Sequence, residues 1–458
     1  MSLVETLRQS LGADGVRDAQ AIEPRRLRDW AVAAAPDVVP AALVLPRTTQ
    51  QVSDALTLCH AARVPVVTQG GLTGLAGGAT PVAGCVLLSL ERMQAIESID
   101  TLNATLTVQA GALLQAVQQA AHTAGWLFPL DIGARGSCTI GGNLATNAGG
   151  NRVLRYGMAR DLVLGMEVVL ADGTVIESLG QMQKNNAGYD VRQLFVGSEG
   201  TLGVITRAVL KLVPQTQGTH TALCALPDMG GAGRLLTAAR QHLGGILSAF
   251  EVMLPTFYGL ATEALRSAPL PVGHGAYVLL ESAGFDTAAD GANFAAFLEQ
   301  MLEDEVVADA VMAQSLKDIE ALWAVREAGG HFLPALGERI GFDISVPTSS
   351  ISAFLDVCLP MLQVRWPGCT AVCFGHMADG NLHLVVKTRD AAQPVHAVEE
   401  AVYDCVRQAR GSVAAEHGVG LHRKDWLGYS RTAAEIALMR QIKTALDPAG
   451  ILNPGKVL

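Results

Sequence analysis

The stretch "GHMADGNLH", residues 375–383, places two histidines on either side of an acidic turn that contains glycine. Strand-like runs flank "MADGN", and its Asp-Gly pair favours a tight reversal. We therefore expect a hairpin that brings His376 and His383 toward each other, with Asn381 on the same side as His383. Imidazole ligands suit Zn²⁺ or a similar divalent ion, although spacing alone leaves ordinary structural roles equally open.

A second stretch, "AAEHGVG" (414–420), sets Glu416 directly beside His417. A glutamate would complete a set of three protein ligands and leave positions on the ion open for substrate. A histidine beside such an ion is suited to general acid–base chemistry, since its ordinary pKa lies near neutrality. A metal-dependent hydrolase would use the same residue types.

Three segments contain more glycine than ordinary turns need: residues 69–81, 131–150 and 197–206. Glycine lets backbone N–H groups approach and surround an anion such as a pyrophosphate. None of the three is a Walker A loop or fits G-x-G-x-x-G, so neither a P-loop kinase nor a standard dinucleotide fold is supported. We expect each segment to follow a strand and all three to serve one phosphate-bearing ligand.

The elements that position these residues mix strands and helices. "AALVLP", "VPVVTQ" and "TLTVQAG" read as strands, and "TTQQVSDALTLCHAA" reads as a helix after a threonine cap. "VLGMEVVLADGTVIES" reads as a hairpin with an Asp-Gly turn. A boundary is expected near residues 211–220, after which helical stretches such as "DGANFAAFLEQMLEDE" are longer, and the final helix stops at Pro448.

Composition narrows the classes of function. The chain has 458 residues and a net charge of −10, which disfavours nucleic-acid and anionic-membrane partners because both require a basic surface. The charge-free run 64–90 contains six glycines and two prolines, so it reads as loops rather than a membrane span. The start carries no secretory signal, and we expect a cytoplasmic protein. The eight cysteines show no paired spacing and are expected to be reduced and structural.

Longer motifs resemble a known family. "PVVTQGGLTGLAGGATP", "FPLDIGARGSCTIGGNLATNAGGNRVLRYG" and "NNAGYDVRQLFVGSEGTLGVIT" resemble the FAD-binding domain of the vanillyl-alcohol oxidase (PCMH) type. "GHMADGNLH", "AAEHGVG" and the terminal "ILNPGK" narrow the resemblance to FAD-linked D-2-hydroxyacid dehydrogenases, which include D-2-hydroxyglutarate and D-lactate dehydrogenases and the glycolate oxidase flavoprotein subunit.

The resemblance implies an α+β fold. It comprises an N-terminal helical segment (1–35), an FAD-binding domain of two α+β subdomains (36–215), an α+β substrate or cap domain (216–410) and a C-terminal helical segment (411–458) that returns to the FAD domain and completes the active site.

The resemblance also implies which residues bind FAD. The phosphates would lie on backbone amides of the first glycine segment, and Asn453 would close over the isoalloxazine. The implied residues are Gln69, Gly70, Gly71, Leu72, Thr73, Gly74, Leu75, Pro129, Leu130, Asp131, Ser137, Cys138, Ile140, Gly141, Gly142, Ala145, Thr146, Asn147, Gly149, Gly150, Val204, Ile205 and Asn453. Some relatives attach the flavin through a histidine in the first segment, which has none here. We therefore expect non-covalent FAD.

The resemblance also implies that a divalent ion, expected to be Zn²⁺, is held by His376, His383 and Glu416. His417 would accept the hydroxyl proton and contact the substrate together with Asn381, while the Cα hydride passes to flavin N5. "LWAVREAGG" resembles the family's W-x-x-R-E segment, which makes Arg326 the candidate clamp for the substrate carboxylate. The alternative is a surface arginine paired with a carboxylate.

The motifs also rank the substrates. D-2-hydroxyglutarate ranks first, although two positions where those enzymes tend to carry threonine and lysine are here Gly330 and Gly341. Arg339 is a candidate substitute, and D-lactate, glycolate or D-malate are the alternatives within the family. Beyond the family, a metal-dependent hydrolase or a non-catalytic flavin- or metal-binding module remain open. The resemblance implies a soluble acceptor such as electron-transfer flavoprotein, and a homodimer.

Overall fold

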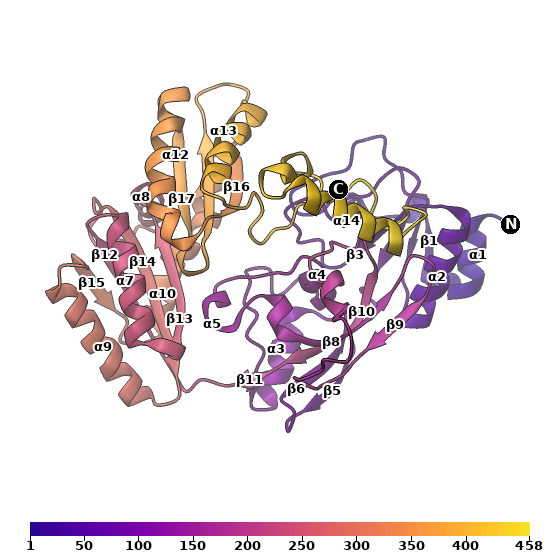
Figure 1. The fold of residues 1–458 in the computed structure, drawn as a ribbon, viewed down its shortest axis with the longest axis horizontal. Coiled ribbons are helices and arrows are strands. Elements are labelled where there is room, and N and C mark those ends of the chain that lie inside the picture. Colours follow the sequence, from indigo (N-terminus) through magenta and orange to yellow (C-terminus); the bar gives the residue numbers. More distant parts are fainter. The chain divides into compact units, whose positions relative to one another are not determined.

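The computed structural model describes residues 1–458, and the chain forms two compact units. Unit 1 comprises Met1–Gly150, Tyr156–Gln215 and Glu416–Leu458, and unit 2 comprises Asn151–Arg155 and Thr216–Ala415. Helix α14 (Ala433–Leu446), yellow in Figure 1, belongs to the same unit as the N-terminus. Both ends of the chain thus build unit 1.

Unit 1 begins with a four-stranded sheet. Its order is β1 (Val16–Asp18), β2 (Ala42–Val44), β4 (Val86–Ser89) and β3 (Val66–Gln69), with β2, β4 and β3 parallel. Helix α2 (Thr49–Ala62) joins β2 to β3, and its first turn is capped by the Thr48 hydroxyl, which accepts from the Gln51 N–H at 3.2 Å. The predicted strands and the threonine cap are confirmed. Strand β3 leads directly into the first glycine segment.

A second sheet of unit 1 has five antiparallel strands. Its order is β5 (Ile96–Asp100), β6 (Thr105–Gln109), β10 (Val204–Lys211), β8 (Val163–Val169) and β9 (Val175–Ser178). The predicted β8–β9 hairpin is confirmed, and Gly173 in its turn has φ of 90°. The other elements of the unit are short: α1 (Leu3–Leu11), α3 (Leu114–Thr123), β7 (Trp126–Leu127), α4 (Ile140–Ala145), α6 (Arg192–Phe195) and β11 (Val213–Pro214).

One expectation about the glycine segments is wrong. The first two follow strands β3 and β7, but the third follows helix α6. The reason is local: "RQLF" forms one helical turn whose Phe195 side chain is 1% exposed and joins the core of the unit. A buried aromatic next to glycine is compatible with either element, so composition did not distinguish them.

Unit 2 is built on a seven-stranded antiparallel sheet. Its order is β15 (Asp309–Met312), β12 (Gly218–Leu226), β14 (Ala276–Gly284), β13 (Leu247–Met253), β17 (Thr370–His376), β18 (Asn381–Lys387) and β16 (Ile340–Ser345). Strands β17 and β18 carry His376 and His383, the predicted metal ligands of this unit. Strand β13 contains no predicted site residue, but it pairs directly with β17.

Helices α8 (Pro255–Leu265), α10 (Leu316–Glu327) and α11 (Gly329–Phe332) share one hydrophobic core with the sheet. That core contains Phe257, Leu322, Val325, Val372 and Val385. Helices α7 (Met229–His242) and α9 (Thr287–Glu303) contact β12 and β14, while α13 (Val395–Gln408) contacts β16 and α12 (Ile351–Arg365). Helix α10 is therefore held against the sheet that carries the predicted metal ligands.

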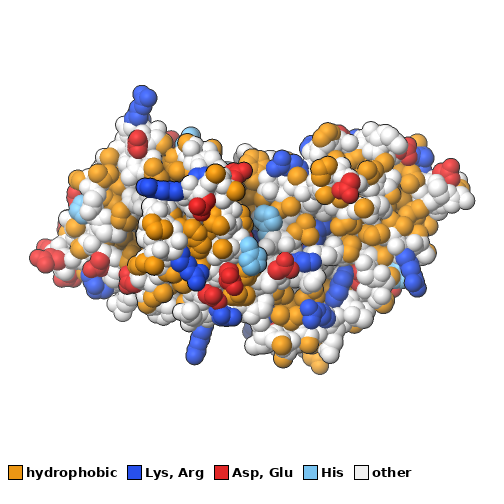
Figure 2. Space-filling model, turned by 90° about the horizontal axis from the view of Figure 1, so that it is seen from above, with side chains coloured by type: hydrophobic (Ala, Val, Ile, Leu, Met, Phe, Trp, Pro, Cys, Tyr) orange, Lys and Arg blue, Asp and Glu red, His pale blue; other side chains and the backbone are white.

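No helix is both long and apolar enough to cross a bilayer. All eight cysteines are buried and free, as expected. On the face shown in Figure 2, acidic and basic side chains alternate among apolar and uncharged ones.

Candidate active site

The predicted histidine hairpin is present in unit 2. Strand β17 ends at His376 and β18 begins at Asn381, after a short turn in which Gly380 has φ of 87°. The backbone register pairs His383 with Phe374, so the two histidines are diagonal neighbours rather than directly opposite. Their ring centroids lie 5.5 Å apart, with planes at 85°. Such a pair can present ring nitrogens to one ion.

Glu251 in β13, which sequence reasoning missed, binds two of the predicted residues. Its Oε1 accepts from His376 Nδ1 at 2.7 Å, and its Oε2 accepts from Arg326 Nε at 2.8 Å and forms an ion pair with Arg326 Nη2 at 2.7 Å. Burial acts to raise the pKa of Glu251, but the charges and hydrogen bonds of His376 and Arg326 outweigh it and leave the pKa below its usual value. Arg326 is therefore neither a surface arginine nor an isolated cation, since its guanidinium is buried on Glu251 and lies 4.9 Å from the Phe374 ring centre.

Asp343 in β16 is a second residue that the sequence did not single out. It pairs with His383 across the sheet, and its Oδ1 lies 3.7 Å from His383 Nδ1. The same oxygen accepts from Asn381 Nδ2 at 2.8 Å. The other side-chain atom of that amide, Asn381 Oδ1, is buried and has no hydrogen-bond partner. Asp343 thus orients Asn381 so that an unsatisfied carbonyl oxygen lies on the strand that carries His383.

Glu416 and His417 open the last segment of unit 1. Glu416 Oε2 accepts from the Gly150 N–H at 3.1 Å, and its Oε1 lies 3.7 Å from His417 Nε2. The preceding residue, Ala415, ends unit 2 and donates its N–H to the Asp343 carbonyl at 3.2 Å. Glu416 therefore follows a residue that is hydrogen-bonded to β16, while its own side chain contacts the second glycine segment.

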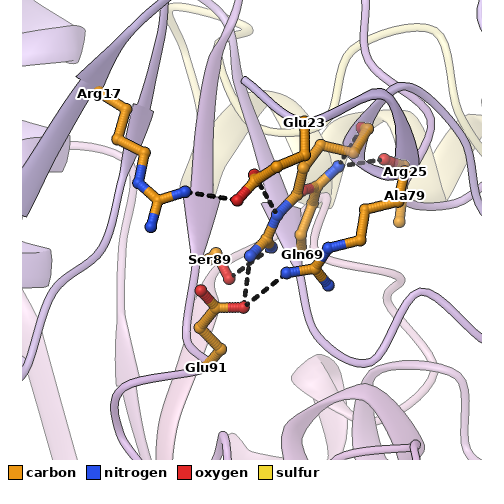
Figure 3. Close-up of polar contacts among 8 residues, drawn as sticks. Arg17, Glu23, Arg25, Gln69, Ala79, Ser89 and Glu91 are labelled. Carbon is orange, nitrogen blue, oxygen red and sulfur yellow. Dashed lines mark hydrogen bonds and ion pairs between the residues drawn. The ribbon is translucent and has the colours of Figure 1, made fainter. Parts of the chain in front are cut away.

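The first glycine segment begins at Gln69, a buried residue at the end of β3. Its Nε2 donates to the carbonyls of Arg26 and Ala79, at 2.8 and 3.1 Å, and so spans the segment (Figure 3). The Arg26 guanidinium is held in turn by the Ser89 hydroxyl at 2.9 Å and by the Glu91 carboxylate. This network connects the segment to strand β4, which ends at Ser89.

Asp29 anchors the middle of the same segment. Its Oδ2 accepts from the Gly77 N–H at 2.7 Å, and its Oδ1 accepts from the Val32 N–H at 2.7 Å. Burial raises the pKa of Asp29, and these N–H groups oppose that rise. A β-carbon at Gly74 would lie 3.3 Å from Asp29 Oδ2, so glycine at this position leaves the anchor undisturbed.

The second glycine segment packs directly against the first. A β-carbon at Gly71 would lie 2.0 Å from the Ser137 carbonyl oxygen, and one at Gly70 would lie 2.5 Å from Thr139 Oγ1. Thr139 also caps α4, because its hydroxyl accepts from the Gly142 N–H at 3.3 Å. Both glycines are therefore required for the close approach of two loops, in addition to any approach to a phosphate.

The third segment meets the C-terminal tail at Glu199 and Asn453. Asn453 Nδ2 donates to the carbonyls of Glu199 and Gly78 at 2.6 and 2.9 Å, and its Oδ1 accepts from Lys456 Nζ at 2.6 Å. The side chain of Asn453, predicted to close over a flavin ring, is thus held by protein partners. Its contacts join the first and third segments to the tail.

The Glu199 carboxylate is almost fully buried. It accepts from the N–H groups of Val419 and Gly420 at 2.7 and 3.0 Å, just after His417. Burial raises the pKa of Glu199 to about 7, against the opposing effect of these N–H groups and of Lys456. Burial also lowers the pKa of Lys456 to about 8. Both groups therefore change charge close to neutral pH.

The protein atoms fit both predicted cofactors. Thr68 Oγ1 and Gln69 Oε1, where β3 meets the first glycine segment, are buried without a hydrogen-bond partner, which suits a polar ligand at that loop. In unit 2, a metal-binding histidine usually donates from its other ring nitrogen to a carboxylate, as His376 does to Glu251. The predicted FAD residues, Glu416 and His417 all lie in unit 1, whereas Arg326, His376, Asn381 and His383 lie in unit 2.

Comparison with known proteins finds two family models. Residues 40–178 match the FAD binding domain, and residues 215–457 match the C-terminal domain of FAD linked oxidases. A mitochondrial D-2-hydroxyglutarate dehydrogenase of Bos taurus is 41% identical over 91% of this chain and 76% of its own length. A Schizosaccharomyces pombe protein that carries the name D-lactate dehydrogenase is 38% identical over 90% of this chain and 80% of its own length.

Among solved structures, p-cresol methylhydroxylase has a TM-score of 0.78 and 18% sequence identity, and the match covers 99% of this chain and 96% of that one. At this identity the likeness shows the fold alone.

Proposed function

Because the chain belongs to the FAD-linked oxidases, oxidoreductases that act on CH–OH groups, we propose that it oxidises a D-2-hydroxy acid to the 2-oxo acid. We rank D-2-hydroxyglutarate first, as the relative of Bos taurus bears that activity in its name. Family membership argues against the metal-dependent hydrolase and the non-catalytic binding module.

One observation carries the proposal. Glu251 holds a metal-type histidine, His376, on one carboxylate oxygen and a carboxylate-binding arginine, Arg326, on the other. A 2-hydroxy acid needs both partners side by side, because its hydroxyl and its carboxylate are attached to the same carbon, Cα. Arg326 Nε donates to Glu251 and Nη2 forms an ion pair with the same oxygen, which leaves the two Nη1 hydrogens for a substrate oxygen.

A divalent ion, proposed to be Zn²⁺ and held by His376, His383 and Glu416, would lower the pKa of the substrate hydroxyl. FAD, when bound, supplies the acceptor for the Cα hydride. His417 accepts the hydroxyl proton, and the Oδ1 atom of the Asn381 amide is available to the substrate. Arg326 holds the carboxylate and so fixes which face of Cα is presented.

The FAD would be held by unit 1. The buried oxygens of Thr68 and Gln69 and the tight contact between the two glycine segments support a site at the end of β3. The first segment has no histidine, so we propose a dissociable cofactor.

The surroundings of β16 favour a second candidate substrate. Gly341 lies two residues before Asp343 and thus on the same face of the sheet, opposite Val385. No atom lies within 4 Å of a β-carbon built at Gly341 or Gly330. Arg339 is exposed and donates to the Gly337 carbonyl at 3.0 Å. Glycine at the two positions where threonine and lysine are expected favours a monocarboxylic acid such as D-lactate, and a dicarboxylic acid would need Arg339 as the partner of its second carboxylate.

The test compares kcat/KM for D-2-hydroxyglutarate, D-malate and D-lactate, with L-2-hydroxyglutarate as the stereochemical control. D-2-hydroxyglutarate is expected to give the highest value. A preference for D-lactate of about tenfold or more, about 1.4 kcal/mol of transition-state discrimination, would reverse the ranking and leave the reaction class in place.

We also propose that electrons leave to a soluble acceptor such as electron-transfer flavoprotein and that the protein is a homodimer. Both proposals rest on the family resemblance.

A further inference from the structure

We propose that Glu251 is a positioning residue that joins the metal site to the substrate clamp, so that one carboxylate orients His376 and Arg326 together. The inference rests on the proposed function and deepens it. Every contact that carries it lies within unit 2.

The geometry of Glu251 is specific. The residue is 1% exposed, and the backbone register pairs it with His376 on the neighbouring strand. Its two oxygens are divided between partners, Oε1 to His376 and Oε2 to Arg326. A buried charge with partners on both oxygens has little freedom to move, and loss of either partner leaves it poorly compensated.

On the metal side, the contact selects the ring nitrogen. The Glu251 carboxylate can only accept, so His376 Nδ1 carries the proton and Nε2 is the nitrogen that would bind an ion. A carboxylate in this position fixes the ring orientation and increases the basicity of the ligating nitrogen. Removal of its negative charge should therefore weaken metal binding, even though no ligand is lost.

On the substrate side, the same carboxylate aims the arginine. Arg326 Nε donates to Glu251 Oε2, its Nη2 forms an ion pair with the same oxygen, and the centre of the Phe374 ring lies 4.9 Å from its guanidinium carbon. These contacts confine the plane of the guanidinium. Without these contacts the Arg326 guanidinium can reorient. The substrate carboxylate must then immobilise it on binding, which lowers the affinity.

The sheet offers a matched control. Glu281 on the adjacent strand β14 is also a buried carboxylate that docks α10, since its Oε2 accepts from Trp323 Nε1 at 2.8 Å. It accepts from the Ser248 and Thr221 hydroxyls as well, both at 3.1 Å, so its partners differ from those of Glu251. The Glu281→Gln variant therefore measures the effect of losing a buried carboxylate that contacts α10 but is not bonded to His376 or Arg326.

The experiment uses the FAD-loaded protein and its Glu251→Gln and Glu281→Gln variants. Each is stripped of metal and titrated with Zn²⁺ in competition with a chelator. We expect Glu251→Gln to bind Zn²⁺ roughly 10- to 100-fold more weakly, with unchanged flavin content, and Glu281→Gln to bind within about twofold of the wild type. Steady-state assays at saturating Zn²⁺ should show a raised KM for the hydroxy acid in Glu251→Gln but not in Glu281→Gln.

Equal Zn²⁺ affinity in Glu251→Gln and the wild type would overturn the inference, as would equal losses in both variants, which would indicate a general effect of docking α10. If Glu251→Gln does not fold, Glu251→Asp tests the same point, since a side chain shorter by one methylene cannot reach both partners. A wild type that binds no stoichiometric Zn²⁺ would refute the metal site itself, and this inference with it. Wild-type binding with an unaffected variant would refute only the role of Glu251.

Discussion

Glu199 changes charge near neutral pH, so its replacement by glutamine should alter how the stability of the protein depends on pH. In the folded protein its pKa is raised from 4.5 to about 7, mainly by burial. Between these values the folded state keeps a proton that the unfolded state has lost. The contribution of Glu199 to stability is therefore greatest at low pH and declines as pH rises from about 4.5 to about 7, whereas Glu199→Gln has no such proton to lose.

The size of the effect follows from the shift. A folded pKa of about 7 against 4.5 corresponds to a full range on the order of 3 kcal/mol. Roughly 2.5 kcal/mol of that range falls between about pH 5 and pH 8. The glutamine adds a separate offset, because its amide cannot accept from both Val419 and Gly420, and this loss of about 1–3 kcal/mol does not vary with pH. The change of this stability difference with pH therefore reports the titration of Glu199, whereas its value at a single pH does not.

The assay is urea unfolding at saturating FAD, at several pH values between about 5 and 8, for the wild type, Glu199→Gln and Glu177→Gln. Glu177 is exposed in β9 and serves as the control for loss of a carboxylate. The difference in the free energy of unfolding between wild type and Glu199→Gln should change by roughly 2.5 kcal/mol across the range, in favour of the wild type at low pH. The difference between wild type and Glu177→Gln should stay constant. A constant difference would show that Glu199 keeps one charge state throughout.

Four further changes test the site. Gly74→Leu should release FAD, because even a β-carbon there lies 3.3 Å from Asp29 Oδ2 and a larger side chain displaces the anchor of the loop; full flavin absorbance in the purified variant would place the cofactor elsewhere. His383→Ala should abolish turnover and keep FAD bound, since the two cofactors have separate ligands, and active protein without a stoichiometric divalent ion on metal analysis would refute this. His417→Ala should retain the metal and lower kcat by roughly 10²- to 10⁴-fold, whereas wild-type kcat would exclude it as the base. Arg339→Ala should lower kcat/KM for D-2-hydroxyglutarate and not for D-lactate, and equal changes for both acids would exclude a contact with the second carboxylate.

Much of the fold was predictable from the sequence, because its signals are local or belong to long motifs. The Thr48 cap, the Asp-Gly turn of β8–β9 and the histidine hairpin each depend on neighbouring residues, and all three are confirmed. The resemblance to the FAD-linked family and the α+β fold class are confirmed as well.

The partners of the site residues were harder to predict, because they depend on which strands become neighbours. Glu251 is 125 positions from His376 in the chain, and its only local signal is a charged residue within the apolar run "AFEVM". Asp343 faces His383 only through the pairing of β16 with β18. The hairpin brings His376 and His383 toward each other as expected, but only the strand register shows that they are diagonal neighbours. These facts follow from sheet order, which a single sequence does not reveal.

The most direct test of the proposed function is anaerobic titration of the purified yellow protein with D-2-hydroxyglutarate, followed through the flavin absorbance. We predict that the D acid bleaches the flavin and that equimolar L-2-hydroxyglutarate does not. A flavin spectrum that stays unchanged with D-2-hydroxyglutarate, D-malate and D-lactate alike, in protein with Zn²⁺ bound, would contradict the assignment.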